Sequence, residues 1–140
     1  MSPQPGLVTI DPSAIDEVLE EATASGAATY VLSVPEPADR AAFFDAVRTT
    51  FPLDPPLIGS RSWDALSDSL WEGLRTLDAP RVVIVWRDAE IMSKTHPDDY
   101  QTAVAVLEDI TATLADAKAA IGSTKIVTVY INQPSAPESE

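Results

Sequence analysis

Apolar and polar residues along the chain follow two spacings, one typical of helices and one typical of strands. Apolar side chains that recur every three or four positions predict helices over residues 12–25, 38–51, 63–77 and from 97 towards 122. Runs rich in β-branched and aromatic residues predict strands over residues 30–34, 81–86 and 125–131. Because helices separate the strands, we expect an α/β fold: a small three-stranded parallel sheet covered by helices, with right-handed connections.

The length and the apolar content set the number of domains. A chain of 140 residues with 45% apolar content can build one real core, and we expect one domain with an ordered core over about 7–131. Residues 1–6 and 132–140 are rich in Pro, Ser and Glu, and we expect loose tails there. The proline-rich stretch 52–56 breaks regular structure before residues 58–61 lead into the third helix.

The third helix carries carboxylates at steps of four residues, Asp64, Asp68 and Glu72, which a helix stacks on one face. Such like-charge pairs cost a helix about 0.2–0.5 kcal/mol each. Ser62 is a good N-cap, and Asp64 suits the positive end of the helix dipole. Asp68 and Glu72 lie further along the helix and have no such local reason to be acidic. The face either meets a basic partner or is the solvated side of an ordinary amphipathic helix. Trp71 lies at its border, where the indole serves as core or as a contact surface.

The charge and composition of the chain limit the classes of partner that it can bind. With 9 basic and 22 acidic side chains the net charge is -13, which repels nucleic acid and anionic membranes and speeds encounters with a basic protein. The absence of cysteine excludes disulfides and thiolate metal sites. No targeting segment or membrane span is evident, and we expect a cytoplasmic protein.

Candidate chemistry is sparse. His96, the single histidine, precedes Pro97 at a helix start and fits a loop or cap better than a base or a metal ligand. No glycine-rich phosphate loop is present, and the serines lack a base other than carboxylates. Paired carboxylates could act as acid and base or hold Mg²⁺, but an exposed helix face does not exclude water. We therefore expect no enzyme, no metal and no cofactor, and keep an acidic-site enzyme as an alternative.

The run from Trp63 to Leu70, Trp-Asp-Ala-Leu-Ser-Asp-Ser-Leu, resembles the barstar family of intracellular ribonuclease inhibitors. A proline-containing loop precedes this run and the strand over 82–87 follows it, and the order of elements from Tyr30 to Ile131 is similar to that family throughout. The helix over 12–25 lies before the part that the founding inhibitor covers. The resemblance implies an inhibitor that blocks the active site of a small basic secreted ribonuclease and protects the cell that makes it. We expect a monomer when the protein is free.

The resemblance also implies which residues bind. In that family the second aspartate of the motif, here Asp68, takes the place of a phosphate and meets arginines and a histidine of the nuclease, with Asp64 beside it. A carboxylate can do so because it offers its oxygens to an arginine fork as a phosphate does. An acid of the long helix assists, and ungapped placement assigns Asp109, next to Glu108. The predicted partner-binding residues are Asp64, Asp68, Trp71, Glu72, Arg61, Ser60 and Asp109.

The chain departs from the family pattern in the loop and after the acidic helix. Ser60 stands where glycine is usual, which strains the loop if φ is positive there, unless Gly59 supplies the turn. The usual loop aromatic is absent, and the usual tryptophan after the helix falls near Gly73, so that Trp71 could take over its contact. These departures keep open a second hypothesis: a barstar-derived immunity or interaction module for a different basic toxin or regulatory protein.

Overall fold

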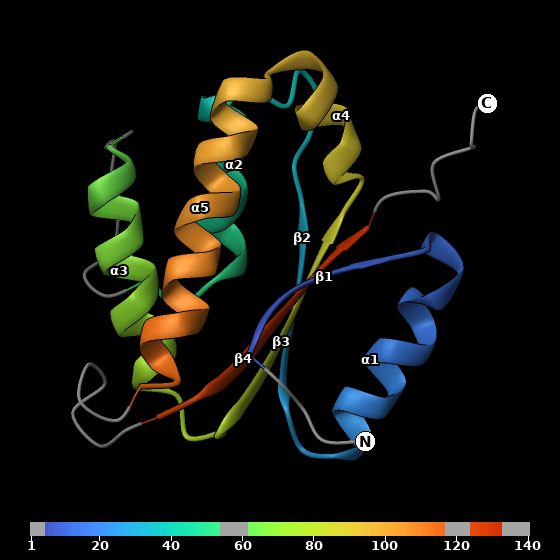
Figure 1. Cartoon of the computed structure of the whole chain (residues 1–140), viewed down its shortest axis with the longest axis vertical. Helices are drawn as coiled ribbons and strands as arrows, with labels where there is room; N and C mark the ends of the chain where they lie inside the picture. The colour runs from blue at the N-terminus through green and yellow to red at the C-terminus, as the bar shows by residue number, and fades with distance from the viewer. Residues whose placement is uncertain (1–4, 54–61, 117–123, 133–140) are drawn as a thin grey trace.

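The computed structural model describes residues 5–53, 62–116 and 124–132, which form a parallel sheet with helices on both faces (Figure 1). The sheet has four strands in the order β1-β4-β3-β2. The strands are β1 (Gly6–Ile10), β2 (Ala28–Ser33), β3 (Arg81–Arg87) and β4 (Ile126–Asn132). The helical elements are a 3-10 turn η1 (Pro12–Ala14), α1 (Ile15–Ala24), α2 (Arg40–Thr50), α3 (Trp63–Arg75), α4 (Ala89–Thr95) and α5 (Pro97–Leu114).

The predicted α/β class, the parallel sheet and the extra N-terminal helix are confirmed, whereas the predicted number of three strands is wrong. The strand that was not predicted, β1, pairs in parallel with β4 at the edge of the sheet. Its five residues are too few to establish a period, and none of them is fully buried. Gly6 and Asn132, assigned to the predicted tails, belong to β1 and β4.

The connection after β3 contains a short helix, α4, which the sequence did not predict. Only Ala89 and Met92 of this short helix are buried, so its sequence shows little helical spacing. Asp88, just before α4, has a left-handed backbone with φ of 56°. His96 joins α4 to α5 and makes no side-chain cap.

The main core lies between one face of the sheet and the helices α2, α3, α4 and α5. Alternate residues of β3, Val82, Ile84 and Trp86, point into it, and all are at most 1% exposed. Trp86 contacts Phe43 of α2, with ring centroids 5.2 Å apart. The alternation of β3 therefore divides its side chains between two cores, which confirms the prediction of a strand covered on both faces.

The second face of the sheet is covered by α1. Val83 and Val85 of β3 pack there with Ile15 and Ala22, and all four side chains are at most 3% exposed. An ion pair links the C-terminal end of α1 to the start of β3. The Arg81 guanidinium donates to both carboxylate oxygens of Glu21, at 3.1 Å each, and to Ser25 Oγ at 2.7 Å. This bidentate geometry is the strong form of such a pair.

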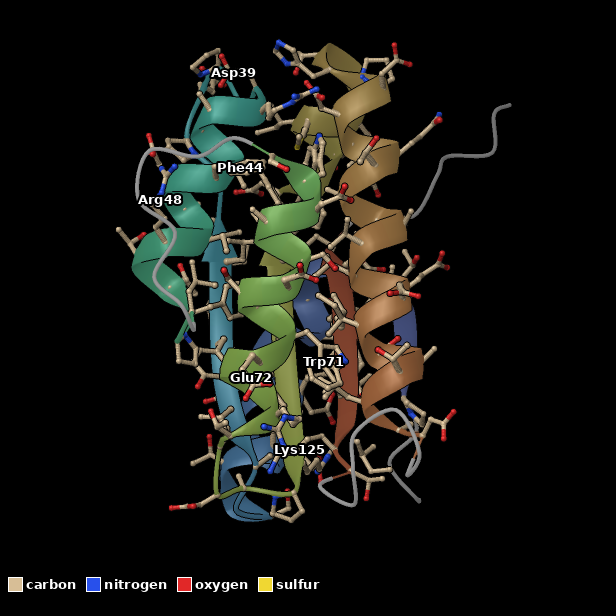
Figure 2. All side chains as sticks on the ribbon, turned by 90° about the vertical axis from the view of Figure 1, so that its left-hand side faces the viewer. Asp39, Phe44, Arg48, Trp71, Glu72 and Lys125 are labelled. Atoms are coloured by element: carbon tan, nitrogen blue, oxygen red, sulfur yellow. The ribbon has the colours of Figure 1, made fainter. Side chains whose placement is uncertain are left out.

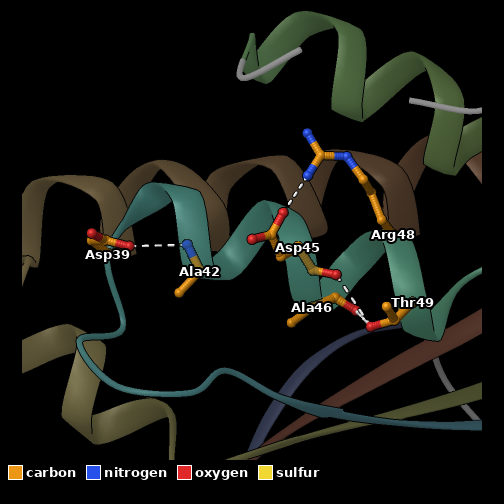
Figure 3. A network of polar contacts seen from close by, with 6 residues as sticks. All are labelled: Asp39, Ala42, Asp45, Ala46, Arg48 and Thr49. Carbon is orange, nitrogen blue, oxygen red and sulfur yellow. Dashed lines mark hydrogen bonds and ion pairs between the residues drawn. The ribbon is translucent and has the colours of Figure 1, made fainter. Parts of the chain in front are cut away.

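Local hydrogen bonds define α2, which leads towards the loop before α3 (Figure 3). Asp39 caps its start by accepting from the Ala42 amide at 2.9 Å. Near its end Arg48 pairs with Asp45, and Thr49 Oγ1 donates to the Asp45 carbonyl at 3.1 Å. Side-chain hydrogen bonds therefore stabilise α2 at both of its ends.

Two contacts set the position of α3. At its start, Trp63 packs on Phe43 and Phe44 of α2, with ring centroids 5.6 and 5.0 Å apart. Near its end, Gly73 lies against the chain that follows α2, where an added Cβ would be 1.5 Å from the Pro52 carbonyl oxygen. No other residue fits at this position without moving the backbone, so Gly73 cannot carry the tryptophan of the family pattern.

We predict that Gly73→Ala lowers the free energy of unfolding by at least about 2–3 kcal/mol, because the clash with Pro52 outweighs the helix propensity of alanine. Urea unfolding measures the change. Gly26→Ala is the control: its Cβ meets open space, and only its φ of +83° is unfavourable, so we expect a loss near 1 kcal/mol. A neutral Gly73→Ala would contradict the close approach of α3 to Pro52.

We also predict that Ala22→Asp lowers the unfolding free energy by about 3–5 kcal/mol, because it puts an unpaired charge into the second core. Ala24→Asp is the control, because it adds the same negative charge to α1 on its exposed side. It should lower the unfolding free energy by only a few tenths of a kcal/mol. Thermal or urea unfolding compares the two. Equal effects would mean that α1 is not docked on the sheet.

Candidate partner-binding groove

An open groove of about 450 Å³ lies between α3 and α5, which pack side by side on one face of the sheet (Figure 2). It is lined by Ser67, Asp68, Trp71, Glu72, Asp109 and Thr113. The first four belong to α3 and the last two to α5. The helix pair thus brings together residues that are about forty positions apart in the sequence.

Trp71 crosses from α3 to α5. Its indole Nε1 donates to Thr113 Oγ1 at 2.8 Å, and that hydroxyl donates in turn to the Asp109 carbonyl oxygen at 2.9 Å. The ring also packs against the main core. The two roles considered from the sequence are therefore compatible, because Trp71 is part of the packing and at the same time presents a fixed aromatic surface in the groove.

Carboxylates stand on both walls of the groove. Asp68 of α3 and Asp109 of α5 are exposed, and within the described ranges neither carboxylate has an ion-pair or hydrogen-bond partner. Two unpaired acids at one site raise the negative potential there. Their arrangement suits a ligand that brings positive charge.

Glu72 has a different electrostatic state. Arg75 donates to it through Nε at 2.9 Å and through a terminal nitrogen at 2.6 Å. The hydrogen bond from Arg75 holds the pKa of the Glu72 carboxyl below its ordinary value. The Arg75 guanidinium carbon also lies 5.8 Å from the centroid of the Trp71 ring. The acidic face of α3 is therefore neutralised at one end.

Asp64 is not among the residues that line the groove. Asp64 is exposed in the first turn of α3, and Ser62 caps that helix by accepting from the Ala65 amide at 3.4 Å, as predicted. Ser60 and Arg61 lie outside the described residues, as does Gly59. Asp68, Trp71, Glu72 and Asp109 are the predicted residues that the fold brings together.

Sequence reasoning missed Thr113 and Arg75. Thr113 follows Asp109 by four positions, and Arg75 follows Glu72 by three, so both lie on the same helix faces as predicted residues. Helical spacing was thus an available signal for both. The hydrogen bond between Trp71 and Thr113 depends on how α3 packs against α5, which the spacing does not reveal, whereas Arg75 contacts Trp71 from one turn further along α3.

The geometry shows no assembled metal or membrane site in the described segments. No group of at least three His, Cys, Asp or Glu side chains is arranged there to hold a metal ion. None of the described helices has both the length and the apolarity needed to cross a membrane.

The fold and the groove define an α/β domain with a parallel sheet and an acidic groove between two helices. The family model for Barstar (barnase inhibitor) matches residues 27–123, and the chain belongs to this family. Proteins of this family are inhibitors and not enzymes, which confirms the expected absence of catalysis. No curated protein and no solved structure gave a significant match. The family match begins after β1 and α1.

Proposed function

We propose that the protein inhibits a barnase-type ribonuclease by placing the groove between α3 and α5 over the active site of the nuclease. Membership of the family implies that the partner is a barnase-like ribonuclease. The observation that carries the proposal is the pair of carboxylates, Asp68 and Asp109, which stand on opposite walls of one groove and have no partner among the described residues. A nuclease active site binds phosphate with cationic side chains, and carboxylates compete for the same cations.

Each part of the groove has a role in this proposal. Asp68 takes the phosphate position and Asp109 binds a second cation from the other wall. Trp71 offers the flat face on which a guanidinium or a ring can stack. Asp64 and Glu72 extend the acidic face along α3, and Ser60 and Arg61 are the proposed loop contacts.

The remaining features of the chain fit the same role. The net charge of -13 attracts a basic nuclease over long distances. In this proposal the inhibitor works in the cytoplasm of the producing cell, is a monomer before it binds the nuclease, and needs no cofactor.

A second candidate function has one observation in its favour. The close contact with Pro52 keeps Gly73 free of any side chain, so the aromatic contact expected there is missing. A partner selected for this surface could then be a different basic toxin. This alternative would be favoured if the protein bound such a toxin through Asp68 and did not bind a barnase-type ribonuclease.

We predict that Asp68→Ala weakens binding of an inactivated barnase-type ribonuclease by about 2–5 kcal/mol, more than any other single acidic change, because it strands the opposing charge in the interface. Isothermal titration measures the affinity. The unfolding free energy should barely change, since the side chain is exposed.

Asp16→Ala is the matched control for this experiment, because it removes an exposed carboxylate of α1 on the other face of the sheet. We expect its effect on affinity to be small. Equal affinities of the parent and of Asp68→Ala would refute the proposed use of the groove.

We further predict that association is steered by charge. Raising the ionic strength from about 0.01 M to about 0.15 M shortens the screening length from about 30 Å to about 8 Å. The association rate should then fall by at least about tenfold, while the dissociation rate changes much less. Stopped-flow mixing with the inactivated ribonuclease measures both rates. An association rate that does not depend on salt would mean that the net charge plays no part in the encounter.

A further inference from the structure

Arg75 occupies the Glu72 end of the groove. Within the free protein it makes the contacts that a cation of a partner would make there. Its guanidinium binds both carboxylate oxygens of Glu72, at 2.9 and 2.6 Å. It also lies over the Trp71 ring, 5.8 Å from the centroid. The side chain is 23% exposed, so these contacts are partly shielded from water. A carboxylate fork and an aromatic face are together the preferred surroundings of an arginine.

The intramolecular contacts divide the groove into two ends of different charge. At one end Asp68 and Asp109 are unpaired within the described residues. At the other end Glu72 is neutralised by the adjoining cation, Arg75, which stays partly exposed. A basic side chain that reaches this second end must either displace Arg75 or accept the repulsion of a like charge.

We infer that Arg75 is a specificity-determining residue, which disfavours partners with a cation at the Glu72 end of the groove. The inference rests on the proposed function, because it concerns the same surface. The partner that this site selects presents its cations to Asp68 and Asp109 and a neutral or acidic group to Arg75. Removing Arg75 frees Glu72 and the face of Trp71, and so relaxes this selection.

The test measures association and dissociation rates of an inactivated barnase-type ribonuclease with the full-length protein and its variants, by surface plasmon resonance at physiological salt. The ribonuclease chosen carries a cation opposite Glu72, which makes it the kind of partner that Arg75 disfavours. We expect Arg75→Ala to slow its dissociation by about three- to tenfold, because the freed Glu72 then pairs with that cation. Arg75→Gln removes the charge but keeps much of the side chain over Trp71, and should act in the same direction if Arg75→Ala does not fold.

Lys94→Ala is the matched control. Lys94 pairs with Glu90 on α4 at 3.7 Å, so this change also removes one cation from an ion pair within a helix, away from the groove. It should alter the association rate slightly and leave dissociation unchanged, because only the long-range field changes. The comparison separates a contact in the interface from a change in net charge.

The outcomes distinguish the inference from the proposed function. Slower dissociation of the Arg75 variants supports the inference, as does ribonuclease binding that appears only when Arg75 is replaced. If the parent protein binds and both Arg75 variants dissociate at the parental rate or faster, the inference is overturned while the proposed function stands. If neither the parent nor the variants bind, both are overturned.

Discussion

Burial of β3 on both faces is the constraint on which the rest of the structure depends. Its residues from Val82 to Trp86 are at most 1% exposed, and the strand pairs with β2 on one side and β4 on the other. Two-sided burial requires a layer of helices on each face. One layer contains α3 and α5, so the groove exists because the main core holds these helices side by side. The apolar alternation of one strand thus determines where the acidic surface can form.

The carboxylates of the groove lower the stability of the folded state. Leaving Asp68 and Asp109 without partners in the described structure, in a chain of charge -13, adds repulsion that the folded state must tolerate. In the proposed complex, the same carboxylates gain cationic partners from the nuclease. Trp71 is tied to Thr113 and loses little conformational freedom on binding. A rigid aromatic surface between unpaired acids is consistent with a site prepared for a basic protein.

The sequence predicted the elements that carry a clear period, and the structure differs where the period was short or absent. Long apolar spacings identified α2, α3 and α5, whereas β1 and α4 bury too few side chains to be recognised. Within the site, the register of α3 and the family resemblance led to Asp68, Trp71 and Asp109. The pairing of Glu72 with Arg75 follows from side-chain conformation, and the restriction at Gly73 follows from a tertiary contact with Pro52. Neither can be derived from spacing alone.

The N-terminal unit of β1 and α1 contributes no residue to the proposed site. The family match starts at residue 27, after this unit. The strand β1 adds to the edge next to β4, and α1 covers the face opposite α3 and α5 (Figure 1). The added core, with Val83 and Val85, is separated from the groove by the thickness of the sheet. Substitutions in α1 should therefore affect folding, whereas differences in partner choice should arise from α3, α5 and the residues between α2 and α3.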